Sequence, residues 1–314
     1  MANLLDNLKY QFKSGGMFIK LIFINVAVFV FFNLIATIAA LMKWDDLFIT
    51  FINGSIFIPT QWFSFSTDPE LVITRPWTII TYMFMHGGFM HLLMNMIIFF
   101  FMGKMLEQYL GTKKMLSIYI IGGIVGALIY FGAHNIFPLL SEKGHVPMVG
   151  ASASVMAILA AIATYAPNVE VYVFGAIKVK LYIIAILYGL IDLLSLGSGD
   201  GTAHFAHLGG ALWGVLYIIQ LKKGKDMAIW FDKLMSRIVG TFKKAPKIKV
   251  AHSKYRKPKK TKKASFKTTP PRDDKDYNSQ KIDKQAHLDA ILDKIKVGGY
   301  ECLSVSEKRF LSEF

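Results

Sequence analysis

"HVPMVGASASVMAILAAIATYAP", residues 145–167, is an apolar run with a proline near each end. It is short for a membrane span but apolar enough to lie in one. Its first residues, Gly150-Ala151-Ser152-Ala153, are small, so the Ser152 hydroxyl has no bulky neighbour along the chain. This pattern predicts a membrane helix that other groups can approach closely at its first turn.

Five more apolar stretches surround this one in the sequence. A bilayer core of about 30 Å needs about 20 apolar residues in a helix. Hydrophobic residues make up 54% of the chain, which excludes a disordered chain and an ordinary soluble domain. We therefore predict an all-α membrane protein with six transmembrane helices, over residues 17–42, 83–103, 115–137, 149–166, 179–196 and 203–221.

Basic residues set the predicted orientation of these spans. Lys and Arg are frequent before the first span, in the second and fourth connections and in the tail, and they are sparse in the other connections. The positive-inside rule then puts both termini, including residues 1–16, in the cytoplasm. The first outer connection, about 44–76, is too apolar for a solvated loop, so we expect short interfacial helices there.

Three groups of polar residues lie at the outer ends of spans two, four and six. They contain His91 and Asn95, then Ser152, and then His207. Polar residues inside a membrane are costly and mark functional sites by default. Because all three spans enter from the same side, we expect these groups to lie at one depth and to form one site.

The residue types at this site point to acyl transfer. Gly210 and Gly214 form a small-residue stripe that lets another helix come close, which would bring Ser152 within hydrogen-bonding distance of His207. An imidazole is the usual base for a serine nucleophile. His91 and Asn95, four residues apart on one helix face, can donate to a developing oxyanion.

Other interpretations remain open at this point. A Gly-Ala-Ser-Ala run by itself is more often a packing face, and His204 and His207 with His86 and His91 could ligate a metal or haem. Against a metal, the chain has no H-E-x-x-H motif and no acidic residue is expected near these groups. Asp192 lies near the outer end of span five with an open role. We predict no metal and no cofactor.

Several motifs resemble those of the rhomboid intramembrane serine proteases. "RPWTIITYMFMHGGFMHLLMNM" resembles their first loop and H-x-x-x-N motif, and "MGKMLEQYLG" resembles the end of their second span. "GASAS" resembles their G-x-S-x motif, and "AHLGGALWG" their A-H-x-x-G-x-x-x-G. The resemblance covers residues 17–221, and the motifs occur in the same order and in the corresponding spans.

This resemblance implies a rhomboid-like bundle and a Ser–His dyad without an acidic third member. Ser152 would be the nucleophile and His207 the general base. His91, Asn95 and the backbone N–H of Ser152 would hold the oxyanion, and Gly150 would allow close backbone approach. His204 and His86 would have no catalytic role.

The sequence also departs from the family pattern. Ala153 follows the serine where the family often has glycine, and Met156 replaces an aromatic residue that often stacks on the histidine. Met156 could pack its sulfur on the imidazole ring. Neither change removes a reacting group, so we expect an active enzyme.

The resemblance implies substrates that are single-pass or multi-pass membrane proteins, cut near the outer face of a bacterial cytoplasmic membrane. A catalytically inactive relative that binds membrane helices is the alternative, and intact Ser152, His207, His91 and Asn95 argue against it. A transporter would need paired broken helices or charge relays, which the sequence lacks.

The tail differs from the apolar body in charge. Residues 1–221 hold 11 basic and 10 acidic residues, a net charge of +1, and residues 222–314 hold 25 and 11, a net charge of +14. Residues 222–280 are predicted to be a disordered basic linker near anionic lipid, with no nucleic acid expected. Residues 281–314 are predicted to be a small helical hairpin with a capping box at Ser304 and Glu307, whose partner is unknown.

Overall fold

The structure is a computed structural model, and it describes residues 4–44, 48–51, 54–142, 144, 146–173, 175–198, 203–242 and 274–312. The chain divides into two compact units, Met1–Pro246 and Lys247–Phe314. Each unit is described by itself below.

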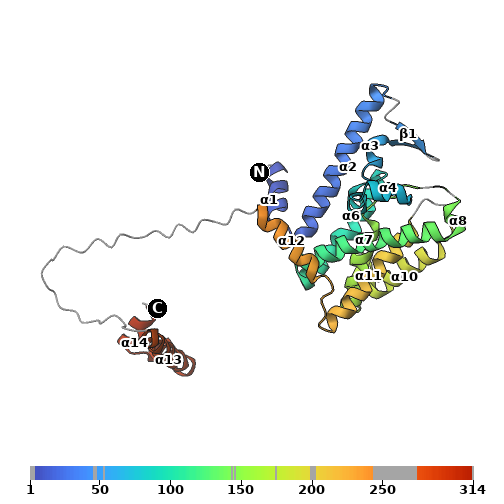
Figure 1. Ribbon diagram of the computed structural model, residues 1–314. Helices are drawn as coiled ribbons and strands as arrows, with labels where there is room; N and C mark the ends of the chain where they lie inside the picture. Colours follow the sequence, from blue (N-terminus) through green and yellow to red (C-terminus); the bar gives the residue numbers. More distant parts are fainter. Residues whose placement is uncertain are drawn as a thin grey trace. The chain divides into compact units, whose positions relative to one another are not determined.

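Six helices of the first unit occupy the predicted spans (Figure 1). They are α2 (Met17–Leu41), α6 (Phe89–Leu110), α7 (Thr112–Ile136), α9 (Ser152–Tyr165), α10 (Leu181–Leu194) and α11 (His204–Lys222). By length and composition α2, α6 and α7 can cross a membrane, whereas α9 and α10 are apolar helices of 14 residues each. The helical membrane fold is therefore confirmed, and three of the six helices meet the full length and hydropathy expected of a span.

Shorter elements connect these helices. The first connection contains the hairpin β1 (Phe48–Phe51) and β2 (Gly54–Phe57), then α3 (Ile58–Gln61), α4 (Pro69–Thr74), α5 (Thr78–Thr81) and η2 (Tyr82–Phe84). The short helices agree with the prediction, but the hairpin was not predicted. Strand pairing is a second way for an apolar segment to satisfy its backbone groups near lipid. Helix α1 (Leu4–Ser14) precedes α2, α8 (Pro138–Ser141) follows α7, and β3 (Glu170–Val173) pairs with β4 (Ile177–Lys180) before α10.

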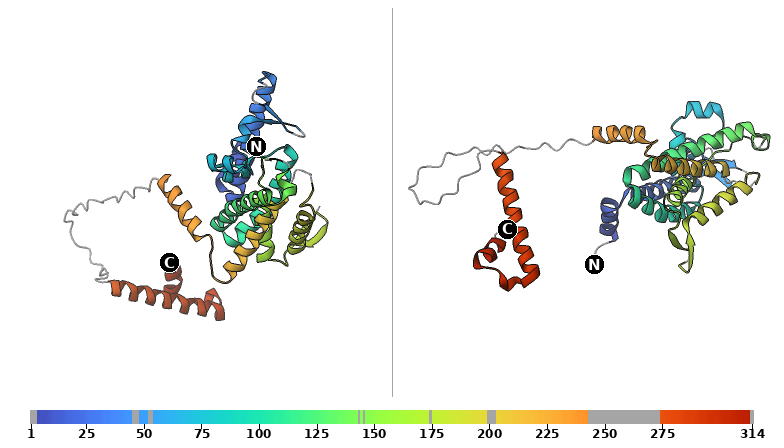
Figure 2. Two further views of the ribbon diagram at one scale, coloured as in Figure 1. Left: turned by 45° about the vertical axis from the view of Figure 1, so that its right-hand side comes forward. Right: turned by 90° about the horizontal axis from the view of Figure 1, so that it is seen from below.

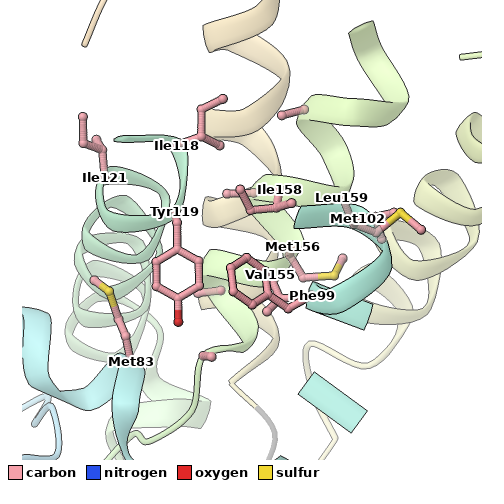
Figure 3. Packing of buried hydrophobic residues seen from close by; sticks show 14 of the residues in the cluster. Met83, Phe99, Met102, Ile118, Tyr119, Ile121, Val155, Met156, Ile158 and Leu159 are labelled. Atoms are coloured by element: carbon pink, nitrogen blue, oxygen red, sulfur yellow. The ribbon is translucent and has the colours of Figure 1, made fainter. Parts of the chain in front are cut away.

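Helix α9 is the centre of the core. All of its residues from Ala153 to Ala163 are buried, and it packs against α6, α7, α10 and α11. Its neighbours supply large side chains, and the rings of Phe99 and Tyr119 lie 5.0 Å apart beside it (Figure 3). Helices α7 and α11 also lie side by side (Figures 1 and 2). The first turn of α9 therefore has little freedom to move.

A carboxylate joins α6 to the start of α2. The backbone N–H groups of Met17 and Phe18 donate to the two oxygens of Glu107, at 2.9 and 3.0 Å, and the Thr112 hydroxyl donates to Oε1 at 2.7 Å. The first N–H groups of a helix have no partner within the helix, so an acceptor here stabilises α2.

A helix follows α11 where the sequence predicted a disordered linker. Helix α12 spans Ile229–Phe242, and Ala228 and Phe231 are buried. The prediction for residues 222–280 is therefore wrong over this part, because aromatic and aliphatic residues recur there at helical spacing. Asp226 accepts hydrogen bonds from Lys114, Tyr217 and the N–H of Ala228. Residues 243–273, with most of the basic run, lie outside the described residues.

The second unit is the predicted helical hairpin. Helix α13 (Asp274–Gly298), η3 (Tyr300–Cys302) and α14 (Val305–Ser312) follow one another, so helical structure begins seven residues before the predicted boundary at 281. Ser304 N–H donates to Glu307 Oε2 at 2.9 Å and Glu307 N–H donates to Ser304 Oγ at 3.3 Å, which confirms the capping box. Figure 2 shows α14 folded back beside α13, and the rings of His287 and Phe310 lie 4.9 Å apart.

Candidate active site

Ser152 is the first residue of α9, and an anchored loop leads to it. Phe65 and Met148 exchange two backbone hydrogen bonds, of 3.0 and 2.7 Å, and the N–H of Gly150 donates to the carbonyl of Tyr82 at 3.0 Å. Gly150 has φ +126°, a conformation that side chains rarely adopt, so the turn into α9 requires glycine here. These contacts fix where the Ser152 side chain begins.

His207 reaches Ser152 from the first turn of α11. Its Nε2 lies 2.8 Å from Ser152 Oγ. The approach depends on small residues, because a side chain at Gly210 would clash with the carbonyl of Ala153, and one at Gly214 would clash with the carbonyl of Ala157. The helix that the glycine stripe lets come close is therefore α9, the helix that begins with Ser152.

Asp192 of α10 completes a chain of polar contacts that the sequence did not predict. Its Oδ1 lies 2.9 Å from His207 Nδ1 and 2.7 Å from His204 Nδ1, and it is 5% exposed. The expectation of no acidic residue near the histidines is therefore wrong, and the dyad without an acidic third member stays a prediction. The sequence showed that Asp192 is a carboxylate within a predicted span. Its spacing from His204 and His207 did not show that α10 packs against α11.

The same three side chains form the one group of potential metal ligands found among the described residues. The ligand atoms of Asp192, His204 and His207 lie within 4.8 Å of one another. His86 and His91 are not in this group, and their rings contact each other at 5.2 Å between centroids. The four-histidine site considered above is therefore not assembled.

His91 and Asn95 lie in the first two turns of α6. The His91 ring lies against Gly150, since a Cβ placed there would be 2.7 Å from His91 Nε2 and 3.6 Å from Ser152 Oγ. Asn95 is buried, and its Nδ2 donates to the carbonyl of His91 at 2.8 Å, which leaves its second N–H for another acceptor. His86 Nε2 accepts from the N–H of Ala151 at 3.4 Å, a supporting contact next to the serine.

The two departures from the family pattern lie in the core. Ala153 is buried, and its side chain faces Gly126 of α7, so a larger residue would push α9 away from α7. Met156 is buried in the cluster that includes Phe99 (Figure 3). Its predicted contact with the ring of His207 stays a prediction.

Two cavities lie beside the loop that precedes Ser152, and Pro147 of this loop lines both. The larger, of 180 Å³, is lined by α2 residues such as Phe29 and Asn33 and by His86 and Val149. The smaller, of 110 Å³, is lined by residues such as Gln61 and Arg75. Ser152 and His207 line neither of these two cavities, and both residues are partly exposed.

Two known families match this chain, one in each structural unit. Residues 74–223 match the model of the Rhomboid domain, and residues 273–314 match a family of unknown function (DUF6576). The first match contains Ser152, His207, Asp192, His91 and Asn95. The second covers the helical hairpin.

Individual relatives are similar to about half of the chain. Rhomboid-like protease 3 of Toxoplasma gondii is 32% identical over 50% of this chain and 57% of its own length. RHOMBOID-like protein 12, mitochondrial, of Arabidopsis thaliana is 28% identical over 47% of each chain. Presenilin-associated rhomboid-like protein A, mitochondrial, of Danio rerio is 28% identical over 46% of this chain and 37% of its own length. This chain thus spans between about a third and three fifths of these relatives.

Proposed function

The chain belongs to the rhomboid family, and we propose that it is an intramembrane serine endopeptidase. The single observation that carries this proposal is the 2.8 Å contact between Ser152 Oγ and His207 Nε2. A serine hydroxyl is a weak nucleophile until an adjacent base accepts its proton. An unprotonated imidazole nitrogen at hydrogen-bonding distance is such a base.

The reaction would proceed through an acyl-enzyme. His207 Nε2 takes the Ser152 proton while Oγ forms a bond to the scissile carbonyl carbon, whose π electrons move to the oxygen. When the tetrahedral intermediate collapses, the C–N bond breaks and His207 returns the proton to the leaving amine. Water, activated by the same histidine, then releases the acyl group from Ser152.

The oxyanion of the intermediate would be held by His91, Asn95 and the backbone N–H of Ser152. The His91 ring lies beside Gly150, two residues before the nucleophile, which supports this role. Asn95 has an N–H that its bond to the His91 carbonyl leaves free to donate. Removing one such donor typically lowers turnover about 10²- to 10³-fold.

The proposed substrates are membrane proteins whose spanning helix unwinds locally near the outer face. Backbone groups paired within a helix are not available for attack, so local unwinding must precede cleavage. The proposed orientation puts both termini in the cytoplasm and the site toward the outside, on the basis of the Lys and Arg distribution. The bacterial membrane stays a prediction, because the relatives named above are from eukaryotes.

Labelling with a fluorophosphonate probe tests the proposal. The full-length protein in detergent is expected to label, and Ser152→Ala and His207→Ala are expected to abolish labelling. Ser154→Ala is the matched control, because Ser154 is a buried serine two residues further along the same helix. It should label like the wild type.

Two outcomes would contradict the proposal. One is an absence of labelling in wild-type protein whose helical circular dichroism and thermal unfolding show an intact fold. The other is equal labelling of the Ser152→Ala variant. The alternative, a protein that binds membrane helices without cutting them, would then be favoured.

A further inference from the structure

We propose that Asp192 is a positioning residue for His207, so that Ser152, His207 and Asp192 act as a triad in this chain. This inference rests on the proposed function. It goes beyond the dyad that the sequence resemblance implied, because it assigns a role to a carboxylate on a third helix.

The three residues form one continuous line of hydrogen bonds. Ser152 Oγ is 2.8 Å from His207 Nε2, and His207 Nδ1 is 2.9 Å from Asp192 Oδ1. They come from α9, α11 and α10, which pack together in the first unit. The imidazole ring of His207 is therefore held at both nitrogens.

The carboxylate determines which nitrogen of His207 carries the proton. An ionised carboxylate only accepts hydrogen bonds, so the contact at Nδ1 requires Nδ1–H. In a neutral ring Nε2 is then unprotonated and can accept the Ser152 proton. When it does so, the positive imidazolium lies beside the negative Asp192, which stabilises the charge that forms during the reaction.

A second histidine holds the carboxylate in place. His204 Nδ1 lies 2.7 Å from the same Asp192 Oδ1, and His204 Nε2 lies 3.3 Å from Ser198 Oγ. Asp192 is 5% exposed, so its orientation depends on these protein partners. A buried carboxylate that was not bonded in this way would be strongly disfavoured, which argues that the whole arrangement is built for the carboxylate.

Other titratable groups also face His207, and the test must leave them in place. His204 lies three residues away on α11, at 6.1 Å between ring centroids, and His91 of α6 interacts electrostatically with His207. Asp192 of α10 is the carboxylate in contact with the ring. The Asp192→Asn substitution removes that negative charge and changes no other group.

The experiment measures the rate of fluorophosphonate labelling from pH 4 to pH 9 for wild type and Asp192→Asn. We expect Asp192→Asn to lower the plateau rate by about two orders of magnitude or more. We also expect the ¹⁵N-histidine spectrum of Asp192→Asn to show that His207 no longer carries its proton on Nδ1, because the new amide can donate to that nitrogen. Glu142→Gln, an exposed carboxylate in the same unit, is the control for charge alone.

The outcomes separate this inference from the proposed function. If Asp192→Asn labels at the wild-type rate, or labels more slowly while His207 keeps its proton on Nδ1, the positioning role is wrong and the protease proposal stands. If the folded wild type does not label at all, the proposed function is wrong and this inference falls with it.

A second measurement tests the inference if Asp192→Asn does not fold. In unchanged protein labelled with ¹⁵N-histidine, the resonances that disappear in His207→Ala report the tautomer of His207. A proton on Nδ1 with an unprotonated Nε2 at neutral pH is the expected result. A proton on Nε2 would overturn the inference without any substitution at Asp192.

Discussion

Gly210 of α11 lies directly against the backbone carbonyl of Ala153 in α9, with no side chain between the two helices. This contact is one residue from Ser152 and three from His207. Its closeness is what allows a hydroxyl and an imidazole on separate helices to meet at 2.8 Å. The packing of the helices and the chemistry of the site therefore depend on the same small residues.

Gly210→Ala should lower both stability and labelling. The added methyl group meets the Ala153 carbonyl and must push α11 away, at a cost of about 1–3 kcal/mol. Gly189→Ala in α10 is the control, because nothing lies within 4 Å of a methyl group there. It should stabilise the helix slightly, by up to about 1 kcal/mol. Thermal unfolding in detergent and labelling rates would show the contrast, and equal behaviour of the two variants would contradict it.

Gly150→Ala should slow labelling through the entry turn. Gly150 has φ +126°, and an added Cβ would lie 2.7 Å from the His91 ring. Strain of about 1–3 kcal/mol would shift Ser152 or His91, lowering the rate by about 5- to 150-fold. Gly88→Ala, at the residue before α6, has extended backbone and open space, so it should label normally. A normal rate for Gly150→Ala would show that the turn tolerates a side chain.

His91→Ala and Asn95→Ala should each lower turnover of a cleavable membrane substrate. The expected loss is about 10²- to 10³-fold in kcat, because each removes a donor to the oxyanion. KM should change little, since the oxyanion exists only after attack. Met94→Ala is the control on the same helix, where the side chain is 51% exposed. A loss in KM alone would assign these residues to substrate binding.

Glu107→Gln should destabilise the start of α2. The carboxylate accepts from the backbone N–H groups of Met17 and Phe18, and the amide can accept at one oxygen only. The expected loss is about 1 kcal/mol. Hydrogen exchange of peptides covering residues 17–24 should become faster in this variant and stay unchanged in Glu142→Gln. Unchanged exchange in both would contradict the capping role.

The helical hairpin should lose protection in acid. Lys294 and the hydrogen bonds from Ser304 lower the pKa of Glu307 from its ordinary value of 4.5 to about 2. A lowered pKa in the folded state means that the stabilisation is present above pH 4.5 and is lost as the pH falls from 4.5 through 2. Hydrogen exchange of residues 294–312, corrected for the intrinsic rate, should therefore show weaker protection at pH 2.5 than at pH 5.

Glu307→Gln provides the check on this prediction. It should show the weaker protection already at pH 5, where the wild type still has its ionised carboxylate. Glu301→Gln is the matched control, because Glu301 is 92% exposed on its side chain and contacts only Lys308 among the described residues. Protection that does not change with pH in the wild type would exclude a contribution from Glu307.

Sequence pattern was sufficient for most of the fold. Apolar length placed all six helices, and the capping box at Ser304 and Glu307 was predicted from spacing alone. It missed the β1–β2 hairpin and α12, because short strands and interfacial helices have weak local signals that depend on what covers them.

For the site, the sequence by itself identified the candidate groups. Ser152, His207, His91 and Asn95 were identified because costly polar residues recur at the same ends of alternate apolar spans. Their distances could not be predicted, since they depend on how closely α9 and α11 pack. Only the tertiary structure decided that Asp192 of α10 contacts His207 and His204, because hydrophobic periodicity shows which residues are apolar but not which helices become neighbours.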